Sequence, residues 1–365
     1  MKKHPENDTK DISRRNFLKG AVAGSLGISV LSLPFTSSLN ESAAMEAAVN
    51  NNSSSSGAAG VPRSGLKDLF MKDGKPVVVS ISGGEKIKRL EKGIEALPNF
   101  ASIMKGKKIT LKPNTVAAGP YPVSSDPELV IHLCKILKDC GAADVSIYDA
   151  SGRTAAKFSM MGLEAAAAKI GFNLAPDEPG NKSLFRAVTN PAWQVMPVID
   201  LSNYLCGRDI IINMPTVKRH SEAGFSSSMK NLFGCVYGPN RYESHARLRQ
   251  RQNPQEFEES FRIPFRMLSA EFSDAVRCEL SVVDAADLLT KSGPLLDGAE
   301  IKKGVNQMFI SGDIVACDTL SSKLMAEHDS TYSEDMWKDA LAHARKLRLG
   351  TDDLNAVSLV KYNLG

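Results

Sequence analysis

The sequence lacks most of the motifs that identify a particular chemistry. Its six cysteines include no C-x-x-C pair, so we expect neither a zinc ribbon nor a ferredoxin-type iron–sulfur cluster. It has no G-x-S-x-G elbow and no H-E-x-x-H motif, which leaves hydrolase mechanisms of those two types without support. A Walker phosphate loop, a nucleotide-binding fingerprint and a flavin motif are also missing. No single motif therefore assigns a reaction.

The chain also has little excess charge, because 45 Lys and Arg residues stand against 41 Asp and Glu residues. Without residues 1–44, which we expect to be removed, 39 basic and 37 acidic residues remain, a net charge of about +2. A protein this close to neutral gives no indication of nucleic-acid binding, and we expect none. One polar stretch is locally basic, which predicts a solvated face, with an anion-binding patch as the alternative. Its arginines are Arg241, Arg247, Arg249 and Arg251.

The N-terminus has the order of features that is typical of a twin-arginine export signal. Arg14 and Arg15 precede an apolar run over residues 20–35, and small residues follow that favour cleavage after Ala44. The run is short and rich in Gly and Ser, whereas a membrane span needs roughly 20 strongly apolar residues. No cysteine precedes Cys134, so the segment has no acceptor for a lipoprotein anchor. The alternative interpretation is a mildly amphipathic N-terminal helix.

This signal predicts where the protein works and what it meets on the way. We expect the twin-arginine translocation machinery as a partner, export in the folded state, and a location in the periplasm or cell envelope. We expect no stable membrane span after cleavage. Residues 45–62 are rich in Asn, Ser and Gly and predict a disordered linker. Residues 63–365 then form the folded domain.

That domain is long enough for one large core, since 42% of the full chain is hydrophobic. Apolar runs alternate with helical patterns, which predicts an α/β fold with a mostly parallel sheet flanked by helices. The expected strands are 76–81, 108–111, 145–148, 209–212, 280–283 and 307–310. The expected helices are 85–97, 127–138, 162–170, 256–272, 314–327 and 334–347. The spacing of Ser125 and Glu128 indicates a capping box before the second helix.

Five of the apolar runs end in a carboxylate or amide residue. The carboxyl ends of parallel strands meet at one sheet edge, where ligands bind in α/β folds, so these side chains predict a shared crevice. The alternative for each is a helix cap or a turn. The five residues are Asn114, Asp149, Asn213, Asp284 and Asp313.

The stretch after the fourth expected strand, residues 213–234, is the densest in chemistry. We interpret it as a loop with a helix-like end that holds an anion through hydroxyls, free N–H groups and lysines. The residues expected to bind the anion are Asn114, Lys218, Ser228 and Asn231. The expected catalytic residues are His220, as a proton shuttle or metal ligand, and Lys230.

Three carboxylates form a hypothetical ligand set for a divalent metal ion: Asp149, Asp284 and Asp318. Asp313 and Asp318 lie five residues apart, so both face the crevice if Asp318 falls one turn into the helix. In the alternative, Asp313 caps that helix and Asp318 is an exposed helix residue.

The sequence resembles the family called Domain of Unknown Function 362. The matching motifs are residues 111–114, 125–130, 138–142, 213–215 with Lys218 and His220, 229–234, Asp284, 293–294 and 312–318. The resemblance implies an α/β domain whose polar motifs gather together, without a known reaction. Some members carry an appended cysteine-rich, ferredoxin-like segment that this chain lacks.

Two functions follow as hypotheses. The first is a metal- or anion-dependent enzyme that acts on a small anionic substrate in the crevice at the strand ends. The second is a non-catalytic protein of the cell envelope that binds a ligand or assists assembly in the same crevice.

Overall fold

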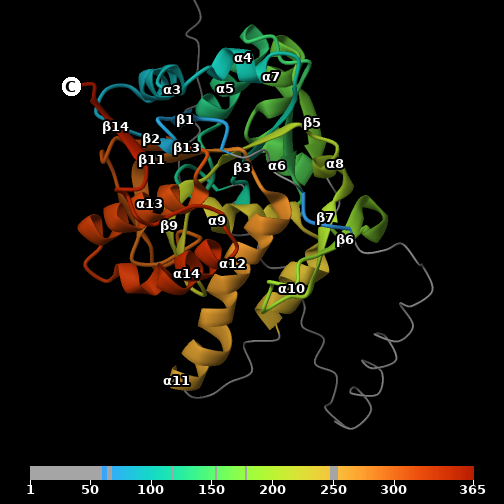
Figure 1. Cartoon of the computed structure of the whole chain (residues 1–365), viewed down its shortest axis with the longest axis vertical. Helices are drawn as coiled ribbons and strands as arrows, with labels where there is room; N and C mark the ends of the chain where they lie inside the picture. The colour runs from blue at the N-terminus through green and yellow to red at the C-terminus, as the bar shows by residue number, and fades with distance from the viewer. Residues whose placement is uncertain (1–59, 64–67, 117–118, 153, 177–178, 247–253) are drawn as a thin grey trace, which may run out of the picture. The chain divides into compact units, whose positions relative to one another are not determined.

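A computed structural model describes residues 60–63, 68–116, 119–152, 154–176, 179–246 and 254–365, and among these residues twelve strands build one mixed sheet (Figure 1). Its strands are β1 (Met71–Lys72), β2 (Lys75–Ser82), β3 (Lys108–Pro113), β4 (Asp144–Asp149), β5 (Asn173–Pro176), β8 (Ile210–Met214), β9 (Thr216–His220), β10 (Gly224–Ser226), β11 (Leu280–Thr290), β12 (Glu300–Lys302), β13 (Gln307–Ser311) and β14 (Ser358–Asn363). Strands β6 (Phe185–Thr189) and β7 (Val198–Ser202) pair separately.

Helices connect the strands. The α-helices are α3 (Lys86–Glu95), α4 (Phe100–Met104), α5 (Pro127–Asp139), α6 (Thr154–Met160), α7 (Leu163–Ile170), α8 (Asn203–Cys206), α9 (Ser228–Asn231), α10 (Gly238–Ala246), α11 (Pro254–Phe257), α12 (Ile263–Val276), α13 (Ile314–His328) and α14 (Lys338–Lys346). Short 3₁₀ turns occur at η2 (Lys182–Leu184), η3 (Leu232–Cys235) and η5 (Glu334–Trp337), and η4 (Glu258–Arg262) is a π-helical stretch.

The centre of the sheet is parallel, as the sequence predicted. Strands β5, β4, β3, β8 and β11 lie side by side in that order, and each neighbouring pair is parallel. Their carboxyl ends therefore share one edge. Strand β13 is antiparallel to both β11 and β2 and points its carboxyl end to the opposite edge. The α/β fold class is thus confirmed, and the sheet is mixed because β13 and the short strands β1, β10 and β12 pair antiparallel with their neighbours.

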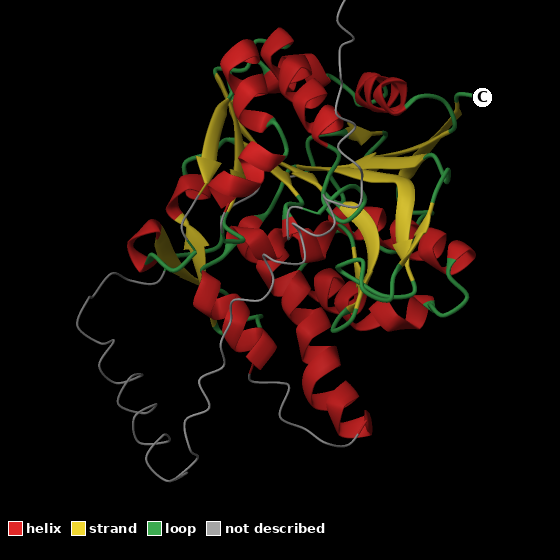
Figure 2. Ribbon diagram, turned by 180° about the vertical axis from the view of Figure 1, so that it is seen from behind, coloured by secondary structure: helices red, strands yellow, loops and turns green. Residues whose placement is uncertain are grey.

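Both faces of the sheet are buried, because successive strand residues alternate between two hydrophobic cores. In β8, Ile210 and Ile212 belong to one core and Ile211 to the other. Helices α3, α4, α5 and α7 cover the first face, and α9, α12, α13 and α14 cover the second (Figure 1). Figure 2 shows the same layers from behind, with the sheet between the two groups of helices.

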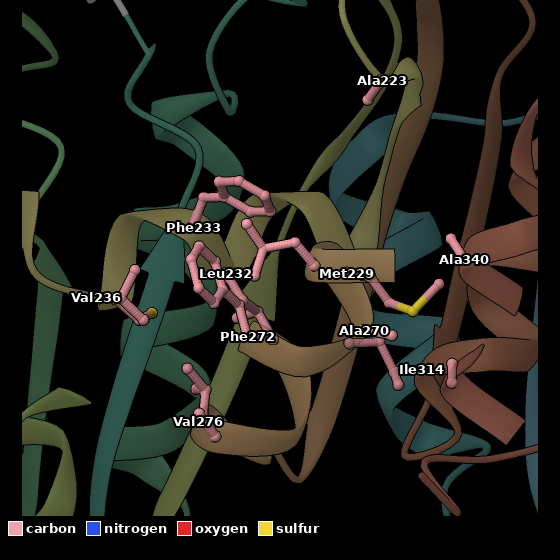
Figure 3. Packing of buried hydrophobic residues seen from close by; sticks show 14 of the residues in the cluster. Ala223, Met229, Leu232, Phe233, Val236, Ala270, Phe272, Val276, Ile314 and Ala340 are labelled. Atoms are coloured by element: carbon pink, nitrogen blue, oxygen red, sulfur yellow. The ribbon is translucent and has the colours of Figure 1, made fainter. Parts of the chain in front are cut away.

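The second core fixes the short helix α9. Met229 of α9 and Leu232 and Phe233 of η3 pack against Phe272 of α12 and its neighbours (Figure 3). The rings of Phe233 and Phe272 meet edge to face with centroids 4.6 Å apart. Such aromatic contacts contribute about 1 kcal/mol beyond area burial, so α9 is held rigidly although it has only one turn.

Three local expectations need correction. Residues 216–226 form the β9–β10 hairpin and not a loop, because the backbones of Lys218 and Ser226 pair in register. The capping residue of α5 is Asp126, whose carboxylate accepts the N–H of Glu128, while Ser125 bonds elsewhere. Gly60, assigned above to the linker, pairs with strand β6, because its extended backbone exchanges hydrogen bonds with Ala187 and Thr189. The other expected helices and strands agree with the structure to within a few residues at their ends, except that the strand expected at 280–283 continues as β11 to Thr290 and the helix expected at 256–272 is divided among α11, η4 and α12.

The expected signal segment, residues 1–44, lies outside the described residues, as does most of the expected linker. In the part of the chain that the structure does describe, no helix is long and apolar enough to cross a membrane. All six cysteines fall in this part, and none forms a disulfide. Cys134 is fully buried on the inner face of α5.

Candidate functional site

A cavity of about 520 Å³ opens beside the carboxyl ends of β3 and β4, and we call it the strand-end pocket. Its lining residues are Lys112, Asn114, Thr115, Val116, Asp149, Ser151, Lys218, His220, Ser221, Glu222, Ser226, Lys230, Asn231, Phe233, Gly234, Gly238, Arg241, Tyr242, His245 and Pro294. Six of the residues expected at the site lie on this wall: Asn114, Asp149, Lys218, His220, Lys230 and Asn231.

Strand β9 supplies two of these side chains because of its period of two. Lys218 and His220 face the pocket, whereas Val217, which precedes Lys218, lies in the hydrophobic core and Arg219, between the two, lines another cavity. The hairpin with β10 fixes the register of β9, and the N–H of Ser221 donates to the carbonyl of Gly293. The positions of both side chains are therefore set by backbone pairing.

A buried ion pair forms the floor at β3 and β4. Lys112 Nζ lies 2.6 Å from Asp149 Oδ2, and each side chain is at most 2% exposed. Burial alone raises the pKa of Asp149, but the charge of Lys112 and hydrogen bonds from Lys112 and Ser151 outweigh it, and the pKa falls below its ordinary value. Gly234 leaves room for this pair, since a Cβ there would approach Lys112 Nζ to 2.8 Å. Asp149 thus stays ionised and neutralises one lysine of the wall.

Two amides follow the strand ends. The side chain of Asn231 donates to Asn213 Oδ1 and to the carbonyl of Lys112, so it ties α9 to β8 and β3. Asn114 Oδ1 accepts the N–H of Val116, which leaves its Nδ2 without an acceptor among the described residues. Asn114 can therefore donate into the pocket, whereas the donors of Asn231 are already engaged.

Lys218 and Lys230 carry the unbalanced charge of the wall. They are 1% and 8% exposed, and neither forms an ion pair with a carboxylate in the described part of the chain. Burial, and then the charges of Lys230 and Lys112, lower the pKa of Lys218 to about 7. Burial is also the largest influence on Lys230 and lowers its pKa to about 7. The charge of Glu222 raises this pKa and the charge of Arg241 lowers it, but both effects are smaller than that of burial.

His220 has a defined hydrogen-bonding state. Its Nδ1 lies 3.2 Å from the backbone nitrogens of both Glu222 and Ala223, which can only donate. Nδ1 is therefore the acceptor, and the neutral ring carries its hydrogen on Nε2. Burial, followed by the charge of Lys230, lowers the pKa of His220 well below its ordinary value. This tautomer favours a hydrogen-bond donor over the expected metal ligand, because Nε2 has no lone pair to offer.

A carboxylate–imidazole pair on the same wall was not found from the sequence. His245 Nδ1 lies 2.5 Å from Glu222 Oε2. When Nδ1–H donates to the carboxylate, Nε2 of His245 keeps a lone pair and can accept a proton, as in other Glu–His and Asp–His pairs. Their 23-residue separation has no motif that reveals the contact.

Arg241 and Lys112 also extend the predicted site. The sequence predicted a solvated face for Arg241, with an anion-binding patch as the alternative. In the structure, Arg241 lines the pocket and donates to the carbonyl of Ala150. The other three arginines of that stretch lie outside the described residues. Lys112 lies one residue inside the strand end, and its sequence signals are the alternation of β3 and the family motif of residues 111–114.

The expected start of the anion site at α9 is already occupied by the protein itself. Asp318 of α13 accepts the N–H groups of Ser228 (2.6 Å) and Met229 (3.3 Å) and the indole N–H of Trp337 (3.1 Å). Ser228 is fully buried, does not line the pocket, and its hydroxyl has no hydrogen-bond partner. Because these N–H groups are satisfied by a carboxylate, they are not available to a phosphate or a substrate carboxylate.

The three carboxylates of the hypothetical metal set do not come together. In the described residues, no group of three or more His, Cys, Asp or Glu side chains could hold a metal ion. Asp149 pairs with Lys112 and Asp318 caps α9, while Asp284 accepts the N–H of Ala286 away from the pocket. Each carboxylate has a structural partner of its own, and this corrects the proposed ligand set.

Asp313 does not lie at the sheet edge that the other four strand-end residues share. Strand β13 runs antiparallel to β11, so Asp313 lies at the opposite edge, where it caps α13 through the N–H of Ala316. Asp318 is fully buried, so neither alternative for it, a metal ligand or an exposed helix residue, agrees with the structure.

A larger cavity, about 590 Å³, lies beyond the turn at His220 and Ser221. Its arginines are already engaged, since Arg266 bonds Glu258 and Arg219 bonds Asp329. Because these arginines are already paired with carboxylates, they would gain little from binding an anion. The strand-end pocket, with two unmatched lysines, is the better candidate site.

Comparisons with known proteins add little about activity. No curated protein matches this chain. Among solved structures, the chain is similar to the lactate racemase apoprotein from Thermoanaerobacterium thermosaccharolyticum, with 14% sequence identity and a TM-score of 0.37. The match covers 58% of this chain and 50% of that chain, so the chain spans about half the length of that protein. This likeness concerns the fold alone.

The family comparison covers the site itself. The model for the Domain of unknown function (DUF362) matches residues 109–323. This range contains the whole wall of the strand-end pocket, from Lys112 to Pro294, as well as Asp318 behind α9. Because the match extends over more than half of the chain, the protein belongs to the DUF362 family.

Proposed function

We propose that this protein is an enzyme that binds a small anion in the strand-end pocket and transfers protons to and from it. The observation that carries the proposal is the pair of buried lysines, Lys218 and Lys230, without a carboxylate partner in the described part of the chain. Burying an unmatched cation costs several kcal/mol, and a bound anion would offset that cost. A small carboxylate or phosphate compound is the ligand class that fits.

The groups on the wall suggest a division of roles. Lys218 donates one of its hydrogens to the carbonyl of Val123, which would hold its ammonium in place while the remaining hydrogens bind the anion. Asn114 would add an amide donor beside it. His220 would donate through Nε2–H to an oxygen of the substrate, as a neutral imidazole does when it polarises a carbonyl.

Proton transfer would fall to the pair of Glu222 and His245. The carboxylate would orient the ring through Nδ1–H, and Nε2 would act as the base. A protein that only carried an anion would need the lysines but not this pair. Glu222 and His245 therefore favour an enzyme over the non-catalytic alternative.

Binding and turnover test the proposal separately. We expect pyruvate, lactate, oxalate or inorganic phosphate to raise the melting temperature of the protein, because a ligand that binds only the folded state stabilises it. Lys218→Gln should abolish this rise. Lys88→Gln is the matched control, since Lys88 is exposed on α3 and does not line the pocket.

Turnover is measured by exchange of substrate C–H hydrogens with deuterium oxide, which should stop in His245→Gln while binding persists. Binding without exchange in the parent would support the non-catalytic alternative. An unchanged melting temperature with every probe would contradict the proposed function.

We also propose that the protein is exported by the twin-arginine pathway and works in the periplasm or cell envelope. Arg14 and Arg15, followed by the short apolar run of residues 20–35, support this location.

A further inference from the structure

Lys230 differs from the other cations on the wall of the strand-end pocket. Three of the four have an oxygen partner at 2.6 Å: Asp149 for Lys112, the carbonyl of Val123 for Lys218 and the carbonyl of Ala150 for Arg241. Lys230 Nζ has no oxygen partner among the described residues, although the side chain is only 8% exposed. Its amino group is therefore not committed to the protein.

The surroundings of Lys230 hold the side chain without occupying its nitrogen. Nζ lies 3.4 Å from the ring centroid of Phe233 and 5.0 Å from that of Phe265. Rings pack against the chain and attract its cationic form, but they provide no strong hydrogen-bond acceptor. Helix α9 is itself fixed by the second core and by Asp318, so Lys230 extends from a rigid element into the pocket.

Burial also changes what the amino group can do near neutral pH. The pKa of Lys230 is lowered to about 7 by burial, with a smaller contribution from Arg241. At pH 7 a lysine with this pKa contains on the order of a thousandfold more neutral amine than an exposed lysine. Only the neutral amine has the lone pair that attacks a carbonyl carbon.

We propose that Lys230 is a nucleophile that forms an imine with the carbonyl carbon of a small 2-oxo carboxylic acid bound in the strand-end pocket. This inference rests on the proposed function, because it requires the pocket to bind a carboxylate. Lys218 and Asn114 would hold the carboxylate, and Nε2–H of His220 would bind the carbonyl oxygen. A 2-oxo acid has its carboxylate directly beside its carbonyl, so Lys218 can hold the carboxylate while the neighbouring Lys230 attacks the carbonyl carbon.

The step balances within the pocket and needs no oxidant or reductant. The neutral Lys230 nitrogen forms a bond to the carbonyl carbon, and His245 moves one proton from this nitrogen to the carbonyl oxygen, which becomes a hydroxyl. His245 then moves the second N–H proton to that hydroxyl, which leaves as water while the C=N bond forms, so both hydrogens of the water come from the amine. One molecule of water is released, and no atom changes its oxidation state overall. The imine would then acidify the C–H bonds next to it, which is the proton transfer proposed for the Glu222 and His245 pair.

Reductive trapping tests the proposal on the full chain. The protein is incubated with pyruvate, 2-oxobutyrate or 2-oxoglutarate and sodium cyanoborohydride at neutral pH, and the products are mapped by peptide mass spectrometry. We expect a gain equal to the mass of the acid less one oxygen atom on the Lys230 peptide. This label should form at least about tenfold faster on Lys230 than on the exposed Lys88.

Variants and a second measurement make the outcome decisive. Lys230→Gln should lose the label, and Lys88→Gln should keep it at Lys230. Lactate, which has the carboxylate but no ketone, should compete with labelling and leave no adduct. Because the peptide map is made on the parent protein, the test does not depend on the folding of a variant.

Two results separate the inference from the proposed function. If lactate and pyruvate raise the melting temperature but no oxo acid labels Lys230 preferentially, the imine is overturned and the anion pocket stands. If no carboxylate binds and labelling is spread over exposed lysines, both are overturned.

Discussion

The carboxylate of Asp318 accepts the backbone N–H of Ser228 at 2.6 Å, so a side chain of α13 caps the first turn of α9. The same carboxylate accepts the N–H of Met229 and the indole N–H of Trp337. All three partners are donors, and Asp318 is fully buried. Helix α9 has only one turn, so its position, and with it the position of Lys230, depends on this contact from outside the helix.

Replacing Asp318 by alanine should therefore destabilise the protein. The substitution leaves three buried N–H groups without an acceptor, and each such group costs about 1–3 kcal/mol. We expect the free energy of unfolding in urea to fall by about 3 kcal/mol or more. Ser228→Ala is the matched control, because it removes from the same turn a hydroxyl that has no hydrogen-bond partner. Equal effects of the two substitutions would refute the capping role.

The lowered pKa of Lys230 predicts a pH dependence of stability with a definite sign. Between about pH 7 and its ordinary value of 10.5, the folded protein has lost the proton that the unfolded chain still holds. Stability from this group therefore increases with pH in that window, by up to about 1.4 kcal/mol per pH unit, and does not change below it.

Lys230→Met removes this dependence. We expect the stability of the parent, relative to Lys230→Met, to rise when urea unfolding is repeated at increasing pH across that window. Lys88→Met should follow the parent, since Lys88 is exposed. Parallel curves for the parent and Lys230→Met would mean that Lys230 titrates like an ordinary lysine.

The affinity for anions should change with pH in the opposite direction. Lys218 binds an anion well only as the ammonium, and its pKa is lowered to about 7. We expect oxalate to bind more weakly as the pH rises through 7, with up to about a tenfold loss per pH unit once the lysine is mostly neutral. Isothermal titration calorimetry on either side of that value measures the change. Lys218→Gln should bind weakly at both, and a pH-independent affinity in the parent would count against the role of Lys218.

The proposed export signal predicts a cellular phenotype. Replacing Arg14 and Arg15 by lysine keeps the charge of the segment but removes the arginine pair that the translocation machinery reads. We expect the precursor to accumulate in the cytoplasm, and the parent to appear in the periplasmic or envelope fraction. Lys2→Arg and Lys3→Arg form the control, because they alter basic residues outside the pair. Normal fractionation of the double lysine variant would exclude the twin-arginine route.

Much of the fold could be predicted from local patterns of residues in the sequence. The apolar face of α5 has the period of a helix, whereas the buried runs that begin β8 and β11 are short, continuous and rich in β-branched residues, as is typical of strands buried on both faces. Strand direction is different, because hydrophobic periodicity is the same for a parallel and an antiparallel strand. Asp313 was grouped with the other strand ends for this reason, and the pairing of β13 with β11 separates it.

In the candidate site too, some residues could be predicted from the sequence and some contacts could not. Lys218 and His220 could be found because residues 213–234 concentrate cations, hydroxyls and amides, although this stretch was expected to be a loop and strand β9 is what places the two side chains on one face. The contact of Glu222 with His245 joins a hairpin turn to the end of α10, and the contact of Asp318 with Ser228 joins two distant helices. Contacts of this kind depend on tertiary packing and cannot be predicted from the spacing of residues along the sequence. Carboxylates expected to gather around a metal are instead distributed as caps and ion-pair partners.

Gly234 offers a test of the buried pair of Lys112 and Asp149 without changing either charge. A Cβ at this position would lie 2.8 Å from Lys112 Nζ, closer than real Cβ contacts allow, and 3.0 Å from Asp149 Oδ2, which is a tight contact. Gly234→Ala should therefore push the two side chains apart and lower the free energy of unfolding by about 2–4 kcal/mol, because breaking a buried ion pair leaves charges without compensation. The control is Gly180→Ala, since a Cβ at Gly180 meets no atom within 4 Å. If crowding of the pair is the cause, Lys112→Met should reduce the effect of Gly234→Ala, and the coupling is measured by a double-mutant cycle in urea. Additive effects would show that the glycine is required for some reason other than the ion pair.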